Sequence, residues 1–143
     1  VSSMTCGAEG LEVDEHSVTI ARYSHGLSKF ETRWGTFTDP WTHQPQPKCG
    51  FVVVGEDGTI ASYDYEPQVT LQTRETPAAT PIPVDELSPG ETDAIAYFIE
   101  RLERDEAPNG PLGIEIARIG QQIVDTAARS AEEKRTLPLI DHE

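Results

Sequence analysis

The feature that most constrains this chain is a long amphipathic pattern between residues 110 and 135. Pro111 suits the first turn of a helix, because its φ is fixed and its missing N–H needs no partner there. Apolar side chains then recur every three or four residues, which places them on one stripe of a helix. Pro138 prevents continuation. We therefore predict a helix of about 24 residues, roughly 36 Å long, that lies on a sheet. The stripe consists of Ile116, Ile119, Ile123, Ala127 and Ala131.

The residues before this helix alternate instead with a period of two, which is typical of strands. We expect one hairpin from residues 17–23 and 27–37, and a second from residues 51–54 and 59–65. The turn Gly55-Glu56-Asp57-Gly58 favours the second hairpin. Residues 69–74 continue the meander. Four consecutive apolar residues at 51–54 are typical of a strand that is covered on both faces.

Strands first and helices last predicts an α+β fold. We expect one open-faced, mainly antiparallel sheet of about six strands, with two C-terminal helices, near residues 91–105 and 111–135, packed on one face. Residues 1–143 have the length of a single domain. The sheet face opposite the helices would then be apolar and exposed unless another surface packs on it, and a second copy of the chain is the simplest candidate. We therefore expect a homo-oligomer, a dimer or a tetramer, through the sheet face.

The chain is strongly acidic, with a net charge of −14 from 25 acidic and 11 basic residues. Few cations remain to neutralise phosphates, so we expect neither a nucleic acid partner nor an anionic membrane surface. No run approaches the ~18 apolar residues of a membrane span. With only two cysteines, the chain is expected to be a soluble, cytoplasmic protein.

Several kinds of site lack their sequence pattern. A dinucleotide site needs a glycine-rich turn between a strand and a helix, whereas Gly55 and Gly58 flank a hairpin turn. The histidines, cysteines and acidic residues lack the spacing of metal ligands. A nucleophilic pair of Cys49 and His43 would lack an orienting third group. We therefore predict no cofactor-binding, metal or catalytic residue in this chain.

A small-molecule site is predicted where the second expected strand ends and a proline-rich loop follows. Aromatic faces, a guanidinium and an imidazole occur together there, and sugars and polyols are held by such mixtures. Alternatively, Trp34 belongs to the core and the loop only packs. The predicted substrate-binding residues are Arg33, Trp34, Trp41 and His43.

Three segments resemble the glucose-fructose oxidoreductase (Gfo/Idh/MocA) family. They are the closing segment GPLGIEIARIGQQIVDTAARSAEEKRTLPL, the hairpin VVVGEDGTIASYDYE, and the connector and helix IPVDELSPGETDAIAYFIERL. The resemblance covers nearly the whole chain, but only the C-terminal half of the family. It implies a dihydrodipicolinate-reductase-like sheet domain that forms the substrate side and the oligomer interface.

The resemblance also implies what a longer parent would contribute. Family members carry an N-terminal Rossmann domain that binds NAD or NADP, and a Glu-Lys-Pro motif whose lysine serves catalysis. Neither can be matched to residues of this chain. We therefore expect the C-terminal domain of an NAD(P)-dependent oxidoreductase acting on a sugar, polyol or related CH–OH substrate, inactive when isolated.

Two alternatives belong to other functional classes. One is a free-standing dimeric module that binds a small molecule or serves as a scaffold without catalysis. The other is a cofactor-independent sugar lyase or isomerase that uses the loop of Trp41 and His43.

Overall fold

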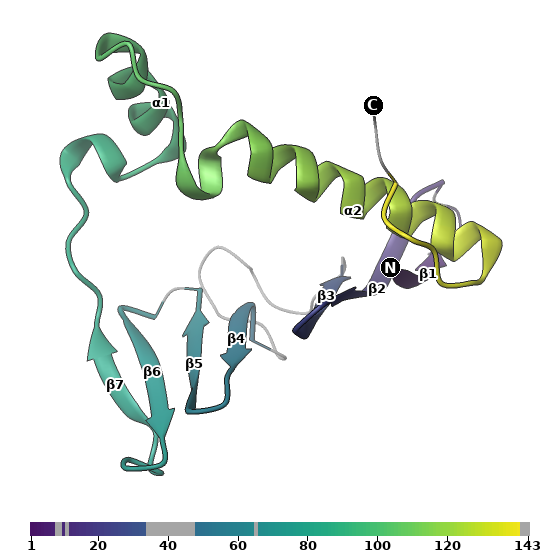
Figure 1. The fold of residues 1–143 in the computed structure, drawn as a ribbon, viewed down its shortest axis with the longest axis horizontal. Coiled ribbons are helices and arrows are strands. Elements are labelled where there is room, and N and C mark those ends of the chain that lie inside the picture. Colours follow the sequence, from purple (N-terminus) through teal and green to yellow (C-terminus); the bar gives the residue numbers. More distant parts are fainter. Residues whose placement is uncertain (8–9, 11, 34–47, 65, 141–143) are drawn as a thin grey trace. The chain divides into compact units, whose positions relative to one another are not determined.

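The computed structural model describes residues 1–7, 10, 12–33, 48–64 and 66–140 (Figure 1). The described part contains strands, two α-helices and two short 3-10 helices. In chain order they are β1 (Ser2–Gly7), β2 (Asp14–Tyr23), β3 (Gly26–Arg33), β4 (Gly50–Val54), β5 (Gly58–Tyr63), β6 (Gln68–Thr73), β7 (Thr80–Pro83), η1 (Pro89–Glu91), α1 (Ala94–Glu103), η2 (Gly110–Leu112) and α2 (Ile114–Glu133).

The predicted α+β class is confirmed, but the prediction of one sheet of about six strands is wrong. The described strands form two antiparallel sheets, with strand orders β1-β2-β3 and β4-β5-β6-β7. The residues between Arg33 and Gly50 include three prolines. The two meanders are therefore not joined by the short turn that holds successive strands in one antiparallel sheet.

The chain divides into two compact units. The first unit comprises Val1–Gly35 and Ser88–Glu143, and the second comprises Thr36–Leu87. The first therefore contains β1–β3 with both α-helices, and the second contains β4–β7. In the part of the chain that the structure describes, no helix is both long enough and apolar enough to cross a membrane.

The α2 helix packs against β1 in the first unit. It begins later than predicted, because Pro111 belongs to the 3-10 helix η2 and an extended Gly113 (φ −70°, ψ 144°) precedes the first α-helical residue, Ile114. It ends at Glu133, where Lys134 takes a left-handed conformation with φ 53° and ψ 39°. The helix therefore has 20 residues instead of the predicted 24 or so.

The face of α2 that is most deeply buried is polar, contrary to the sequence prediction. Its buried residues are Gln122, Thr126 and Ser130. Ile116 and Ile119 of the predicted apolar stripe are 55% and 39% exposed, whereas Ile123, Ala127 and Ala131 nearer the C-terminus are half-buried. The N-terminal part of the stripe is therefore not the surface that packs on the sheet.

Hydroxyl groups explain why a polar face can be buried here. Ser130 Oγ accepts a hydrogen bond from the Ser3 amide at 2.9 Å and donates to the Arg135 carbonyl at 2.7 Å. Thr126 Oγ1 donates to the Gln122 carbonyl at 2.6 Å and accepts from the Ile140 amide at 3.0 Å. A buried polar group costs little when its hydrogen bonds are made. These side chains therefore tie α2 to β1 and to the chain that follows it.

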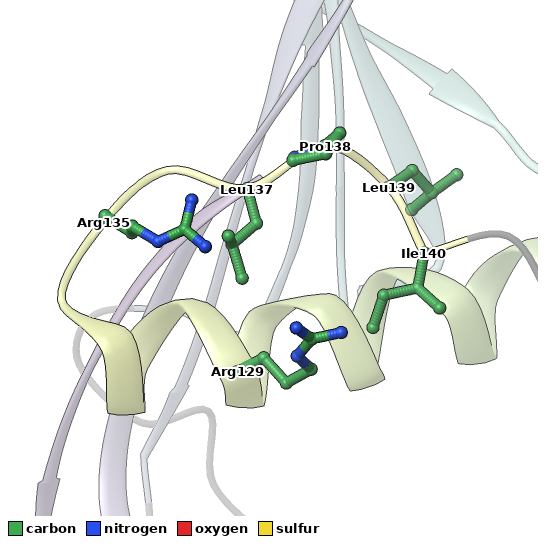
Figure 2. A pocket seen from close by; sticks show the side chains of 6 residues that line it. All are labelled: Arg129, Arg135, Leu137, Pro138, Leu139 and Ile140. Carbon is green, nitrogen blue, oxygen red and sulfur yellow. The ribbon is translucent and has the colours of Figure 1, made fainter.

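The C-terminal segment, residues 135–140, turns back over the end of α2 (Figure 2). Leu137 anchors it, since this side chain is only 5% exposed. The Leu137 amide donates to the Val1 carbonyl at 2.8 Å, and the Val1 amino nitrogen donates to the Leu137 carbonyl at 2.7 Å. These two hydrogen bonds fix the C-terminal segment to the residue that precedes β1.

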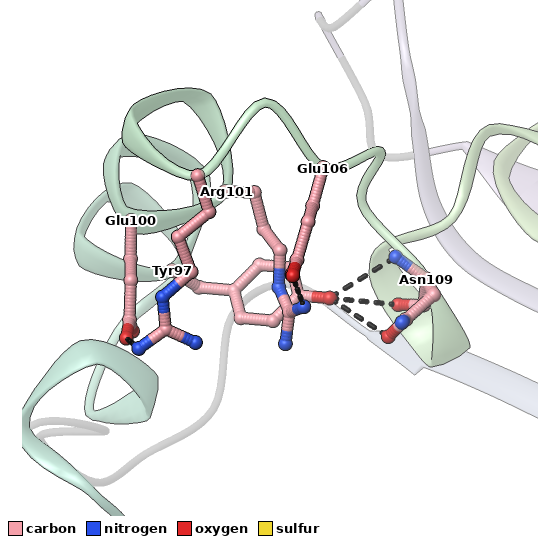
Figure 3. Close-up of polar contacts among 6 residues, drawn as sticks. Tyr97, Glu100, Arg101, Glu106 and Asn109 are labelled. Atoms are coloured by element: carbon pink, nitrogen blue, oxygen red, sulfur yellow. Dashed lines mark hydrogen bonds and ion pairs between the residues drawn. The ribbon is translucent and has the colours of Figure 1, made fainter.

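The α1 helix is fixed mainly by local contacts. The Asp93 side chain caps it by accepting from the Ile95 and Ala96 amides, each at 2.8 Å. The Tyr97 hydroxyl accepts from the Asn109 amide at 3.0 Å and donates to Asn109 Oδ1 at 2.9 Å (Figure 3). The main packing partner of α1 is η1. The prediction that both helices pack on one sheet face is therefore not confirmed for α1.

The second unit presents one apolar sheet face. The pairings Val53↔Ile60↔Leu71 and Val69↔Ile82 place these side chains on the same side of the sheet, together with Phe51. We call this set the apolar sheet face. Phe51, Val53, Ile60 and Ile82 are exposed, and the described part of this unit contains no helix to cover them.

Candidate functional site

The predicted site residue that the structure describes is Arg33, the last residue of β3. It belongs to a charged cluster centred on Glu31. The carboxylate of Glu31 lies 2.9 Å from Lys29 Nζ, 3.1 Å from His16 Nε2 and 3.7 Å from Arg33 Nη2. We call these four residues the Glu31 cluster.

Strand geometry brings the four residues together. Lys29, Glu31 and Arg33 share one face of β3, because successive side chains of a strand point to opposite faces. The register of β2 and β3 sets His16 opposite Arg33. The face bearing the cluster is opposite to the face of Ser3, Thr19 and Ala21, which are buried. The cluster therefore lies on the more exposed face of this sheet.

The electrostatics of the cluster favour an ionised Glu31. The hydrogen bond from Lys29 lowers the pKa of Glu31 most, and the hydrogen bond from His16 lowers it further. Lys29 and Arg33 carry two positive charges against the one negative charge of Glu31. This is a local excess of cation in a chain whose net charge is −14.

The Glu31 cluster is suited to binding a polar ligand. A guanidinium has five N–H donors in a fixed fork, and among the described residues the Arg33 side chain makes only the 3.7 Å contact with Glu31. Its donors can therefore bind hydroxyl or carboxylate oxygens. Val18 and Ile20 lie on the same face of β2 as His16 and supply an apolar surface beside the charges.

The other predicted substrate-binding residues, Trp34, Trp41 and His43, lie outside the described residues. Their grouping with Arg33 remains a prediction.

Lys29, Glu31 and Arg33 alternate within the predicted strand 27–37, but the sequence did not reveal His16 as their neighbour. The preceding strand was predicted to begin at residue 17, whereas β2 begins at Asp14. The register also sets Cys6 opposite His16 on the same sheet face. The sequence could not have indicated either neighbour, because register depends on where the strands meet.

Within the described residues, no three His, Cys, Asp or Glu side chains converge in a way that could hold a metal ion.

No protein-family profile, curated protein sequence or solved structure matches the chain.

Proposed function

We propose that this chain is the substrate-binding and oligomerisation domain of an NAD(P)-dependent oxidoreductase of the glucose-fructose oxidoreductase type. Its substrate would be a sugar, a polyol or a related CH–OH compound. The observation that carries the proposal is the apolar sheet face, which no helix in the described part of its own unit covers. Large exposed apolar patches are typical of protein interaction surfaces.

The proposed occupant of the apolar sheet face is a second copy of the chain. Two identical faces can pack about a two-fold axis, because each then meets the same surface on its partner. Burying one Val, Ile or Phe side chain contributes about 1.5–3 kcal/mol. Phe51, Val53, Ile60 and Ile82 are partly covered already, so each would gain a fraction of that value.

The Glu31 cluster supports the substrate-binding part of the proposal. Arg33 would donate to a substrate hydroxyl, and Trp34, Trp41 and His43 stay the other predicted substrate-binding residues. The chain has no glycine-rich turn for a dinucleotide, so the parent protein would supply NAD or NADP from a Rossmann domain. A cytoplasmic location belongs to the same proposal and rests on the acidic, cysteine-poor composition.

A titration of the chain with NADH and NADPH tests whether the dinucleotide binds to the proposed Rossmann domain of the parent protein and not to this chain. The readout is the fluorescence of Trp34 and Trp41, and light scattering gives the molar mass of the same sample. We expect no saturable cofactor response from a dimer or larger species. Saturable binding of either nucleotide, or turnover of a sugar by the isolated chain, would contradict the proposal.

A further inference from the structure

A hollow of about 410 Å³ lies between the end of α2 and the C-terminal segment. We call it the C-terminal hollow. Figure 2 shows that Arg129 reaches it from the helix, whereas the other lining residues come from the segment above. The side chains of Arg129 and Arg135 bring two guanidinium groups to the hollow, and the other lining side chains are apolar. The lining consists of Arg129, Arg135, Leu137, Pro138, Leu139 and Ile140.

Hydrogen bonds at both ends hold the segment in place around the hollow. At one end Ser130 Oγ donates to the Arg135 carbonyl, and at the other the Ile140 amide donates to Thr126 Oγ1. Between them, Leu137 is paired with Val1 and buried. The hollow is therefore preformed, which lowers the conformational entropy that a ligand would have to offset on binding.

The carboxylate of Glu133 bonds to the guanidinium groups of both Arg129 and Arg135. Glu133 Oε2 lies 2.7 Å from Arg135 Nε, and Glu133 Oε1 lies 3.3 Å from Arg129 Nη2. The hydrogen bond from Arg135 lowers the pKa of Glu133 most, and Arg129 lowers it further. Two cations against one anion leave a net charge of +1. Each guanidinium keeps several N–H donors that Glu133 does not use.

We propose that the C-terminal hollow binds a small amphipathic carboxylate. The carboxylate would accept from the free N–H groups of Arg129 and Arg135, and its apolar part would lie against Leu137, Leu139 and Ile140. A single net positive charge matches a monoanion better than a multiply charged anion. The volume is within the range of small-ligand pockets, which is about 300–1,000 Å³.

Titration with sodium hexanoate, monitored through the amide NMR signals of Leu137, Leu139 and Ile140 in the full chain, tests the site. We expect a saturable shift of these signals and at least fivefold weaker binding of 1-hexanol, which has the apolar part without the charge. Equal binding of hexanol, or no saturable shift with hexanoate, would overturn the proposal.

Matched variants test the role of the guanidinium groups. Arg129→Gln should weaken hexanoate binding about tenfold, because charge-assisted hydrogen bonds are among the stronger ones. Arg118→Gln is the control, since Arg118 lies on the same helix, is also paired with a glutamate and is 50% exposed against 57% for Arg129. Equal weakening by both variants would show that only the overall charge matters and would overturn the site.

A third variant, Leu139→Ala, leaves the charges in place and shortens one apolar wall. It should weaken hexanoate binding severalfold while leaving acetate unaffected. An unchanged affinity for hexanoate would contradict the proposed position of the apolar part.

Discussion

Replacing Ser130 with Ala should destabilise the first unit, because this hydroxyl joins three parts of the chain. It lies on α2, accepts from the Ser3 amide of β1 and donates to the Arg135 carbonyl at the start of the C-terminal segment. Both Ser130 and Ser3 are buried, at 1% and 7% exposure. Water therefore cannot replace the lost oxygen without a change in packing.

The magnitude follows from the groups left without a partner. A buried N–H that loses its acceptor costs about 1–3 kcal/mol. Alanine is the better helix former, which offsets up to about 0.5 kcal/mol. With that offset, the net loss in the free energy of unfolding should be about 0.5–2.5 kcal/mol. With a denaturant dependence of about 2 kcal/mol per molar urea, the midpoint should fall by roughly 0.25–1.25 M.

Urea unfolding followed by circular dichroism measures this loss, and hydrogen exchange locates it. The Ser3 amide should exchange faster in the variant, whereas amides of the second unit should be unaffected. Ser24→Ala, a substitution at an exposed turn position, is the control. A midpoint that Ser130→Ala changes no more than Ser24→Ala does would refute the importance of the buried hydroxyl pair.

Three further predictions concern single interactions. Tyr97→Phe removes the hydroxyl that bonds twice to Asn109, so we expect unfolding to require about 1–2 kcal/mol less, measured by urea titration; an unchanged midpoint would contradict it. Lys134→Gly should stabilise the chain by up to about 1 kcal/mol, because glycine adopts the left-handed conformation at the end of α2 without strain; a lower melting temperature would argue against that account. Lys29 holds the pKa of Glu31 below its ordinary value of 4.5, so this carboxylate stabilises the fold above that pH and the contribution is lost as the pH falls through the lowered pKa. Glu31→Gln should therefore reduce the loss of stability between about pH 5 and pH 3, and an equal loss in both proteins would contradict the ion pairing.

Local signals in the sequence predicted much of the fold. The hairpin turn at Gly55–Gly58 is present, with the Gly55 amide donating to the Gly58 carbonyl at 2.8 Å. The apolar pattern and Pro138 predicted the end of α2 to within two residues of Glu133. Turn residues and helix ends act over a few positions, so they can be read from the chain directly.

The sequence did not reveal which face of α2 is buried. The apolar stripe was the natural choice, but the bond from the Ser3 amide to Ser130 joins residues 127 positions apart. A hydroxyl on a helix carries no sign of a distant partner. The same holds for His16, which becomes a neighbour of Glu31 only through the register of β2 and β3.

The molar mass of the chain and of two valine variants tests the central claim most directly. Val53 lies on the apolar sheet face and is 56% exposed, whereas Val84 follows β7 and is 59% exposed. Light scattering at micromolar concentration should give at least twice the 15.7 kDa mass of one chain for the parent and for Val84→Lys, and a lower mass for Val53→Lys. A parent that is monomeric, or an equal effect of the two variants, would contradict assembly through the apolar sheet face.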